Sequence, residues 1–64
     1  MKFNVFYDTP EGVKEYCLCS MSFREAKKQL ANFKRCYLNE DGSPKVYPNG
    51  KGYYDISNPR IQEV

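Results

Sequence analysis

The chain has 64 residues and a formal net charge of +2, with ten Lys and Arg, eight Asp and Glu and no His. A chain this short forms one domain over residues 1–64 and buries only about 60% of the surface that it exposes when unfolded, so its core must be thin. The four Phe and six Tyr are needed to fill that core. Little material is left to line a substrate cavity, and the composition therefore predicts that the protein is not an enzyme.

No segment has the long apolar run of a signal peptide or a membrane-spanning helix. The first residues, Met1-Lys2-Phe3-Asn4, are of mixed character. The longest uncharged stretch is residues 16–23, far short of the roughly 20 apolar residues that a bilayer requires. We therefore expect a cytoplasmic protein.

The first part of the chain predicts a β-hairpin. Residues 2–8 alternate, with Phe3, Val5 and Tyr7 on one side, which is typical of a strand with one apolar face. Thr-Pro-Glu-Gly at residues 9–12 favours a turn, because Pro presets φ at the second position and Gly closes the fourth. Residues 13–19 are the predicted return strand.

A capped amphipathic helix follows the hairpin. Ser22 and Glu25 form a capping box, in which the Ser hydroxyl accepts from the Glu25 amide and the carboxylate reaches back to the Ser22 amide. The apolar residues of the helix fall within an arc of about 80° on a helical wheel; they are Phe23, Ala26, Leu30 and Phe33. The pattern predicts a helix from Phe23 to a residue between Asn32 and Arg35.

Short strands are expected after the helix, at residues 36–39, 45–47 and 52–56. Residues 40–43 and the Asn49-Gly50 pair predict the turns between them. Ser57-Asn58-Pro59 should break the last strand and leave residues 58–64 as a frayed or lightly docked tail. The expected fold is α+β, a small antiparallel sheet of four or five strands in the order ββ-α-βββ with the helix packed on one face.

No residue pattern indicates catalysis or a cofactor. Without histidine there is no imidazole base, and nothing in the sequence places Lys, Glu or Asp beside a cysteine nucleophile. Gly50-Lys51-Gly52 lacks the spacing of a phosphate-binding loop. We therefore predict no catalytic residues and no cofactor.

The three cysteines, Cys17, Cys19 and Cys36, predict free thiols in a reducing compartment. An odd number cannot pair completely. Cys17 and Cys19 share one face of the predicted strand, where they are badly placed to bridge each other. Structural zinc needs four ligands, usually with Cys-x-x-Cys or His spacing, so no metal site is predicted.

The helix carries a concentrated positive charge. Residues 22–37 hold five basic residues and one acid, whereas the remainder holds five basic and seven acidic residues. The cations occupy a wheel arc of about 20° to 140°, beside the apolar stripe; they are Arg24, Lys27, Lys28, Lys34 and Arg35. A one-signed arc favours a phosphate or acidic-protein contact surface, and the alternative is an ordinary solvated face that favours helix formation.

One thin core cannot bury all six tyrosine side chains. We expect the surplus on the sheet face away from the helix, with Tyr16, Tyr53 and Tyr54 as partner-binding residues. Such a face suits contact with a protein, self-association or stacking against single-stranded bases. The alternative is that these tyrosines only cover the sheet, with their hydroxyls in water.

Residues 16–28, Tyr-Cys-Leu-Cys-Ser-Met-Ser-Phe-Arg-Glu-Ala-Lys-Lys, combine a strand, a short link and a capped helix start. With the preceding hairpin and the strands that follow, this order resembles small phage-encoded anti-CRISPR proteins over nearly the whole chain. It also resembles AP2-like domains and the arm-binding domains of phage integrases, which differ in placing three strands before the helix. The first resemblance implies a phage accessory protein whose basic residues engage a CRISPR effector complex or nucleic acid.

Three functions follow as hypotheses. The first is a non-catalytic phage or mobile-element accessory protein in the host bacterial cytoplasm, such as an anti-CRISPR inhibitor, whose basic helix blocks a nucleoprotein or nucleic-acid-binding surface. The second is a direct DNA- or RNA-binding module. The third is a protein–protein interaction or homodimerisation module that uses a tyrosine-rich sheet face. The expected partner is thus a host defence protein, a nucleoprotein complex or nucleic acid, and not a membrane.

Overall fold

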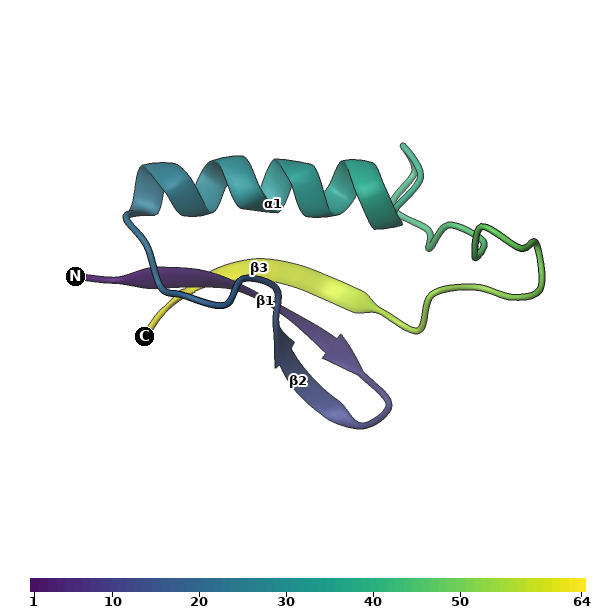
Figure 1. Ribbon diagram of the computed structural model, residues 1–64, viewed down its shortest axis with the longest axis horizontal. Helices are drawn as coiled ribbons and strands as arrows, with labels where there is room; N and C mark the ends of the chain where they lie inside the picture. Colours follow the sequence, from purple (N-terminus) through teal and green to yellow (C-terminus); the bar gives the residue numbers. More distant parts are fainter.

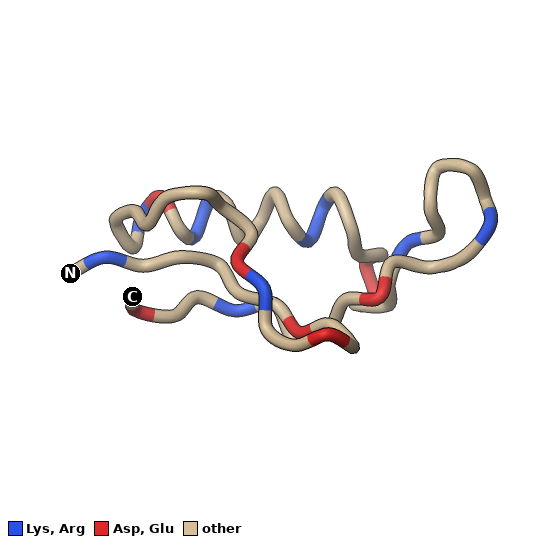
Figure 2. Tube along the Cα trace, turned by 60° about the horizontal axis from the view of Figure 1, so that its bottom comes forward, with Lys and Arg blue, Asp and Glu red and all other residues tan.

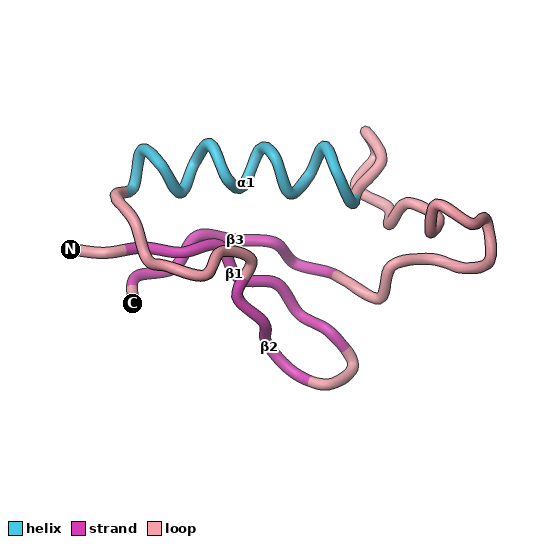
Figure 3. Tube along the Cα trace, in the orientation of Figure 1, coloured by secondary structure: helices cyan, strands magenta, loops and turns pink.

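A computed structural model describes residues 1–64 as three strands and one helix (Figure 1). The elements in chain order are β1 (Phe3–Thr9), β2 (Gly12–Glu15), α1 (Phe23–Tyr37) and β3 (Ser57–Glu63). The sheet is antiparallel with the order β2-β1-β3, so the first strand lies in the centre. The helix covers one face of the sheet (Figure 3). The small α+β class is confirmed, with three strands instead of four or five.

The hairpin turn and the Ser22 N-cap form as their local sequence predicts, whereas the return contact from the Glu25 carboxylate to the Ser22 amide does not form. Thr9 pairs with Gly12 across the turn, and Gly12 has a φ of 121° that a residue with a side chain rarely adopts. At the helix N-terminus the Glu25 amide donates to the Ser22 hydroxyl at 3.2 Å. Ser22 is therefore the N-cap, and it satisfies a backbone donor that has no partner within the helix.

The helix runs through Tyr37, beyond the predicted range, and this displaces the strand expected at residues 36–39. Tyr37 continues the apolar stripe, and its ring centroid lies 5.2 Å from that of Phe33. Leu38 ends the helix in an extended conformation, with its amide donating to the Lys34 carbonyl. Packing of Tyr37 favours one more helical turn over a strand.

A small aromatic core joins the helix to the sheet. The buried apolar residues are Val5, Ala26, Phe33 and Leu38. The ring of Phe33 is only 1% exposed, and its centroid lies 4.9 Å from that of Tyr7 in β1 and 5.2 Å from that of Tyr16. Together with Tyr37, three tyrosine rings therefore pack on Phe33.

The return strand stops at Glu15 because the chain bends away over the following residues. The buried Asn4 side chain donates to the Glu15 carboxylate at 3.1 Å and to the Cys17 carbonyl at 3.0 Å, and its carbonyl accepts from the Val5 amide. Met21 then returns to pair with Phe3. Asn4 thus satisfies backbone and side-chain groups where the ladder is interrupted, and the strand predicted for 13–19 is shortened to 12–15.

The C-terminal residues differ most from the sequence expectation. Ser57–Glu63, expected as a break and a frayed tail, form β3 and pair along the central strand from Phe3↔Glu63 to Asp8↔Ser57. The register shifts between Phe6 and Asp8, where Asn58 has a φ of 53°. Pro59 is tolerated because β3 is an edge strand, in which the backbone nitrogens on the unpaired side need not donate a hydrogen bond.

Residues 39–56 form an arm that extends beyond the end of the helix (Figure 1). The strands expected at 45–47 and 52–56 are reduced to one bridge, Val46↔Tyr53, around the predicted Asn49-Gly50 turn. The arm makes the molecule elongated, with extents of 39 × 24 × 18 Å. The single helix is neither long nor apolar enough to cross a membrane.

Replacement of Phe33 by alanine should remove most of the stability. Truncation of a buried Phe costs about 3–5 kcal/mol, which is comparable to the whole stability of a domain this small, at about 0.05–0.15 kcal/mol per residue. Urea unfolding followed by far-UV circular dichroism measures the loss. Leu18→Ala is the control, since Leu18 is fully exposed and surface changes fall within about 0.5 kcal/mol. A loss below about 1 kcal/mol in Phe33→Ala would contradict this core.

Asp8→Asn should weaken the attachment of β3 in a pH-dependent way. The Asp8 carboxylate accepts from Asn58 at 3.2 Å and from Arg60 at 2.9 Å, and these hydrogen bonds lower the pKa of Asp8 below its usual value. The stabilisation is therefore complete above the unfolded-state pKa, near 3.8, and is lost as the pH falls through the lower folded-state pKa.

The wild-type protein should accordingly have a higher urea midpoint than Asp8→Asn at pH 7, with the gap closing in strong acid. Glu11→Gln removes an exposed carboxylate of the same hairpin that makes no side-chain hydrogen bond, and it serves as the control. Two results would show that the Asp8 contacts do not hold β3. One is a difference in urea midpoint between wild type and Asp8→Asn that stays constant down to pH 2, and the other is a difference equal to that between wild type and Glu11→Gln.

Candidate polyanion-binding surface

The basic helix face consists of five exposed side chains on the solvent side of α1: Arg24, Lys27, Lys28, Lys34 and Arg35. The helix packs on the sheet through Ala26 and Phe33, which are buried. These two anchors leave the cations pointing away from the core. Figure 2 shows Lys and Arg spaced along the helix, whereas Asp and Glu gather in the hairpin and in the turn after the helix.

None of the five cations has an acidic partner. The one ion pair of the structure joins Arg60 to Asp8 on the sheet. The Arg35 guanidinium donates to the side-chain oxygen of Asn32 at 2.6 Å, and the Lys27 ammonium lies 5.8 Å from the centroid of the Phe23 ring. The charge of this surface is therefore not neutralised within the chain and remains available to an anion.

The position of Arg24 acts against helix stability. Lys34 and Arg35 lie in the last turn, where the helix dipole favours positive charge, but Arg24 lies in the first turn, where it does not. Arg24 and Lys28 are also four residues apart, a like-charge spacing that costs about 0.2–0.5 kcal/mol. The helix dipole thus favours the two C-terminal cations and does not account for Arg24.

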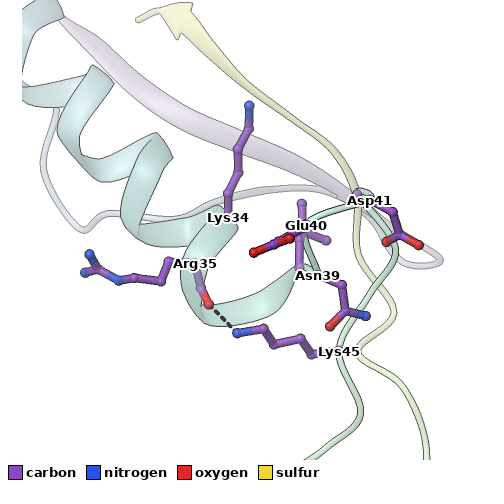
Figure 4. A pocket seen from close by; sticks show the side chains of 8 residues that line it. Lys34, Arg35, Asn39, Glu40, Asp41 and Lys45 are labelled. Carbon is purple, nitrogen blue, oxygen red and sulfur yellow. Dashed lines mark hydrogen bonds between the residues drawn. The ribbon is translucent and has the colours of Figure 1, made fainter.

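An open hollow of about 660 Å³ adjoins the C-terminal end of the basic helix face (Figure 4). Lys34, Arg35 and Lys45 line it, together with the acidic Glu40 and Asp41. The Lys45 ammonium donates to the Arg35 carbonyl, so this arm residue caps the helix and adds a sixth cation to the surface. The sequence did not single out Lys45, because only the fold brings it beside the helix.

The turn after the helix keeps its negative charge. The Asp41 carboxylate accepts from the amide and the hydroxyl of Ser43 at 2.9 and 2.6 Å, and these hydrogen bonds lower the pKa of Asp41. The hollow is therefore mixed in sign, with its cations on the helix side and at Lys45. The part of the surface that carries one sign only is the arc of cations on the helix.

All the tyrosines except Tyr53 pack in one row of rings with Phe33, between the helix, the sheet and the arm, so for them the expectation that they cover the opposite face of the sheet is wrong. Tyr16 packs edge-on against Phe33 at 5.2 Å and near Tyr37 at 6.2 Å, and burial raises its pKa. Tyr54 lies between Tyr37 and Tyr47, at 5.0 and 4.5 Å. Aromatic packing under the helix lets a thin core hold more rings than strand alternation suggests.

Of the three tyrosines predicted to bind a partner, Tyr53 is the most available. It is 65% exposed, whereas Tyr16 and Tyr54 are half-buried in the row of edge-to-face and tilted rings. The opposite face of the sheet carries the alternate residues of β1, among them Phe6 and the ion-paired Asp8. That face has no cluster of tyrosines.

The cysteines are not paired with one another. Cys19 and Cys36 are exposed, and Cys17 is half-buried, which raises the pKa of its thiol. No group of three or more His, Cys, Asp or Glu side chains lies close enough to hold a metal ion. The surface that remains as a candidate site is therefore the basic helix face with Lys45 and the exposed part of the arm.

Comparison with protein families, with curated proteins and with solved structures finds no match to this chain. The functional argument therefore depends on the geometry and charge described above.

Proposed function

We propose that the protein is a non-catalytic binding protein that docks on the phosphates of a nucleic acid, free or within a nucleoprotein complex, through the basic helix face. The observation that carries the proposal is that all five cations are exposed and none is within ion-pair distance of an acid. Clustered cations bind polyanions because they release condensed counterions from the phosphates.

The position of these cations supports binding over a merely solvated surface. Charges kept for solubility alone would be expected in mixed sign and at positions that stabilise the helix. Arg24 instead lies in the first turn of the helix, where the dipole disfavours it. From Arg24 to Arg35 the face extends about 16 Å at 1.5 Å per residue, long enough for several phosphates of one strand.

In its specific form, the proposal is a phage or mobile-element accessory protein that acts in the bacterial cytoplasm, such as an anti-CRISPR inhibitor. The basic face of the helix would cover the surface on which a host nucleoprotein complex holds nucleic acid, or the nucleic acid itself. The small size and the order of hairpin, capped helix and later strand agree with the resemblance noted in the sequence. Dimerisation through a tyrosine face has no comparable support, since the rings pack under the helix.

The double variant Arg24→Glu, Lys28→Glu should lose affinity for duplex DNA by at least tenfold at about 50 mM salt, and the slope of log K against log salt should become shallower by about 2. The reason is the loss of two phosphate contacts. Helix stability should not fall, because an acid at position 24 suits the first turn. Fluorescence anisotropy with a labelled duplex measures both quantities.

Lys2→Glu, Lys14→Glu is the matched control, because both residues are exposed, lie outside the helix and change the net charge equally. It should retain most of the affinity and the wild-type slope. Equal losses in the two double variants would show that only net charge matters. Wild-type protein that binds neither nucleic acid nor a nucleoprotein complex at low salt would remove the proposal.

A further inference from the structure

A second hollow, of about 440 Å³, lies between the arm and the turn of the β1–β2 hairpin. Its wall consists of residues 8–10 of the hairpin, Pro44 and residues 53–57. The pairing of Asp8 in β1 with Ser57 in β3 fixes these two parts of the wall relative to each other. The hollow is therefore held by the fold, although its two sides lie far apart in the sequence.

The charge of this hollow is negative. Asp8 and Asp55 line it, and no Lys or Arg does. Asp8 is ion-paired with Arg60 at 2.9 Å, whereas Asp55 is exposed and has no basic group within ion-pair distance. Glu11 follows Pro10 in the hairpin turn and adds another exposed carboxylate nearby. The hollow thus disfavours phosphates and offers a free carboxylate, that of Asp55, to a cation.

The Tyr53 ring gives the same hollow an aromatic surface. It is 65% exposed and takes no part in the row of rings around Phe33. The next residue, Tyr54, has its ring centroid 5.0 Å from that of Tyr37 in the last helical turn. Tyr53 is therefore presented on an anchored segment, two residues from the unpaired Asp55.

The hollow and the basic helix face lie on different sides of the arm. Tyr53 pairs with Val46 in the isolated bridge, and paired residues direct their side chains to the same face. Lys45 precedes Val46 and is directed to the other face, where its ammonium reaches the Arg35 carbonyl. A ligand in the hollow would therefore not occupy the place of a nucleic acid on the helix.

We propose that this hollow binds an arginine side chain from a basic segment of a partner protein, with the guanidinium over the Tyr53 ring and paired with the Asp55 carboxylate. A cation is attracted to the face of an aromatic ring within about 6 Å of its centroid. Arginine suits the site better than lysine, because its planar guanidinium stacks on a ring and pairs with a carboxylate through two hydrogen bonds.

This binding goes beyond the proposed function, because it adds a protein contact on a surface of opposite charge. Nucleoproteins combine phosphates with basic protein segments. A chain that has a basic helix face on one side and an acidic, aromatic hollow on the other can contact both components of such a complex.

The test titrates ¹⁵N-labelled protein at low salt with the capped peptide Gly-Arg-Arg-Gly, and with the same peptide carrying citrulline in place of arginine. The arginine peptide should shift the amides of residues 8–9 and 53–57 and leave those of residues 24–35 in place, because the basic helix face repels it. Citrulline has a similar shape without the charge and should cause no shift at equal concentration. Equal shifts with both peptides, or none with either, would overturn the inference.

Variants of the two proposed contact residues measure their contributions. Tyr53→Ala should weaken binding of the arginine peptide about 2- to 30-fold, the range expected for a lost cation–π contact. Tyr53→Phe keeps the ring and should bind as the wild type does. Asp55→Asn should weaken binding by up to about fivefold. Glu63→Gln removes an exposed acid at the other end of β3 and is the matched control; a loss equal to that of Asp55→Asn would contradict a specific site.

Other occupants of the hollow give different results. Shifts at residues 53–57 that depend on protein concentration without any peptide would indicate a second copy, and shifts there with an oligothymidylate would indicate nucleic acid; either would overturn the inference. Tyr53→Ala should bind duplex DNA as the wild type does, since it leaves the basic helix face unchanged. Failure of the peptide to bind would therefore leave the proposed function standing, and failure of the duplex to bind would leave this inference standing.

Discussion

The contacts of the Phe33 ring are the interaction on which the rest of the structure depends. Tyr7 of the central strand, Tyr16 of the link and Tyr37 of the last helical turn all pack on it. From Tyr37 the row of rings continues through Tyr54 into the arm. One series of aromatic contacts therefore fixes the helix on the sheet and the arm on the helix, in a chain with only five buried residues.

The same contacts decide what the surface can offer. Because Phe33 and Ala26 turn one side of the helix to the sheet, the cations on the adjacent arc face solvent along its whole length. Because Tyr54 anchors the arm, Lys45 reaches the end of the helix and Tyr53 is held outward. Lys45 thus extends the basic surface beyond the helix, while most acids lie in the hairpin and the turn after the helix (Figure 2). This separation of charge agrees with the proposed contact with the phosphates of a nucleic acid.

Features set by neighbouring residues could be predicted from the sequence, and features set by distant ones could not. The Thr9–Gly12 turn, the Ser22 cap and the arc of cations each depend on a few consecutive residues, and all three are present. The third strand depends on the pairing of Arg60 with Phe6 across most of the chain, and Asn58-Pro59 hides it locally. The side on which the tyrosines lie and the approach of Lys45 to Arg35 likewise depend on tertiary packing, which period-2 alternation does not specify.

The central claim is that the basic helix face binds the phosphates of a nucleic acid. Titration of ¹⁵N-labelled protein with an unlabelled DNA duplex, followed by amide chemical shifts, tests it most directly. The account predicts that the perturbed amides lie in residues 24–35 and at Lys45, with the β1–β2 hairpin and the face of Phe6 unaffected. Perturbation centred on the hairpin, or none at all, would contradict the account.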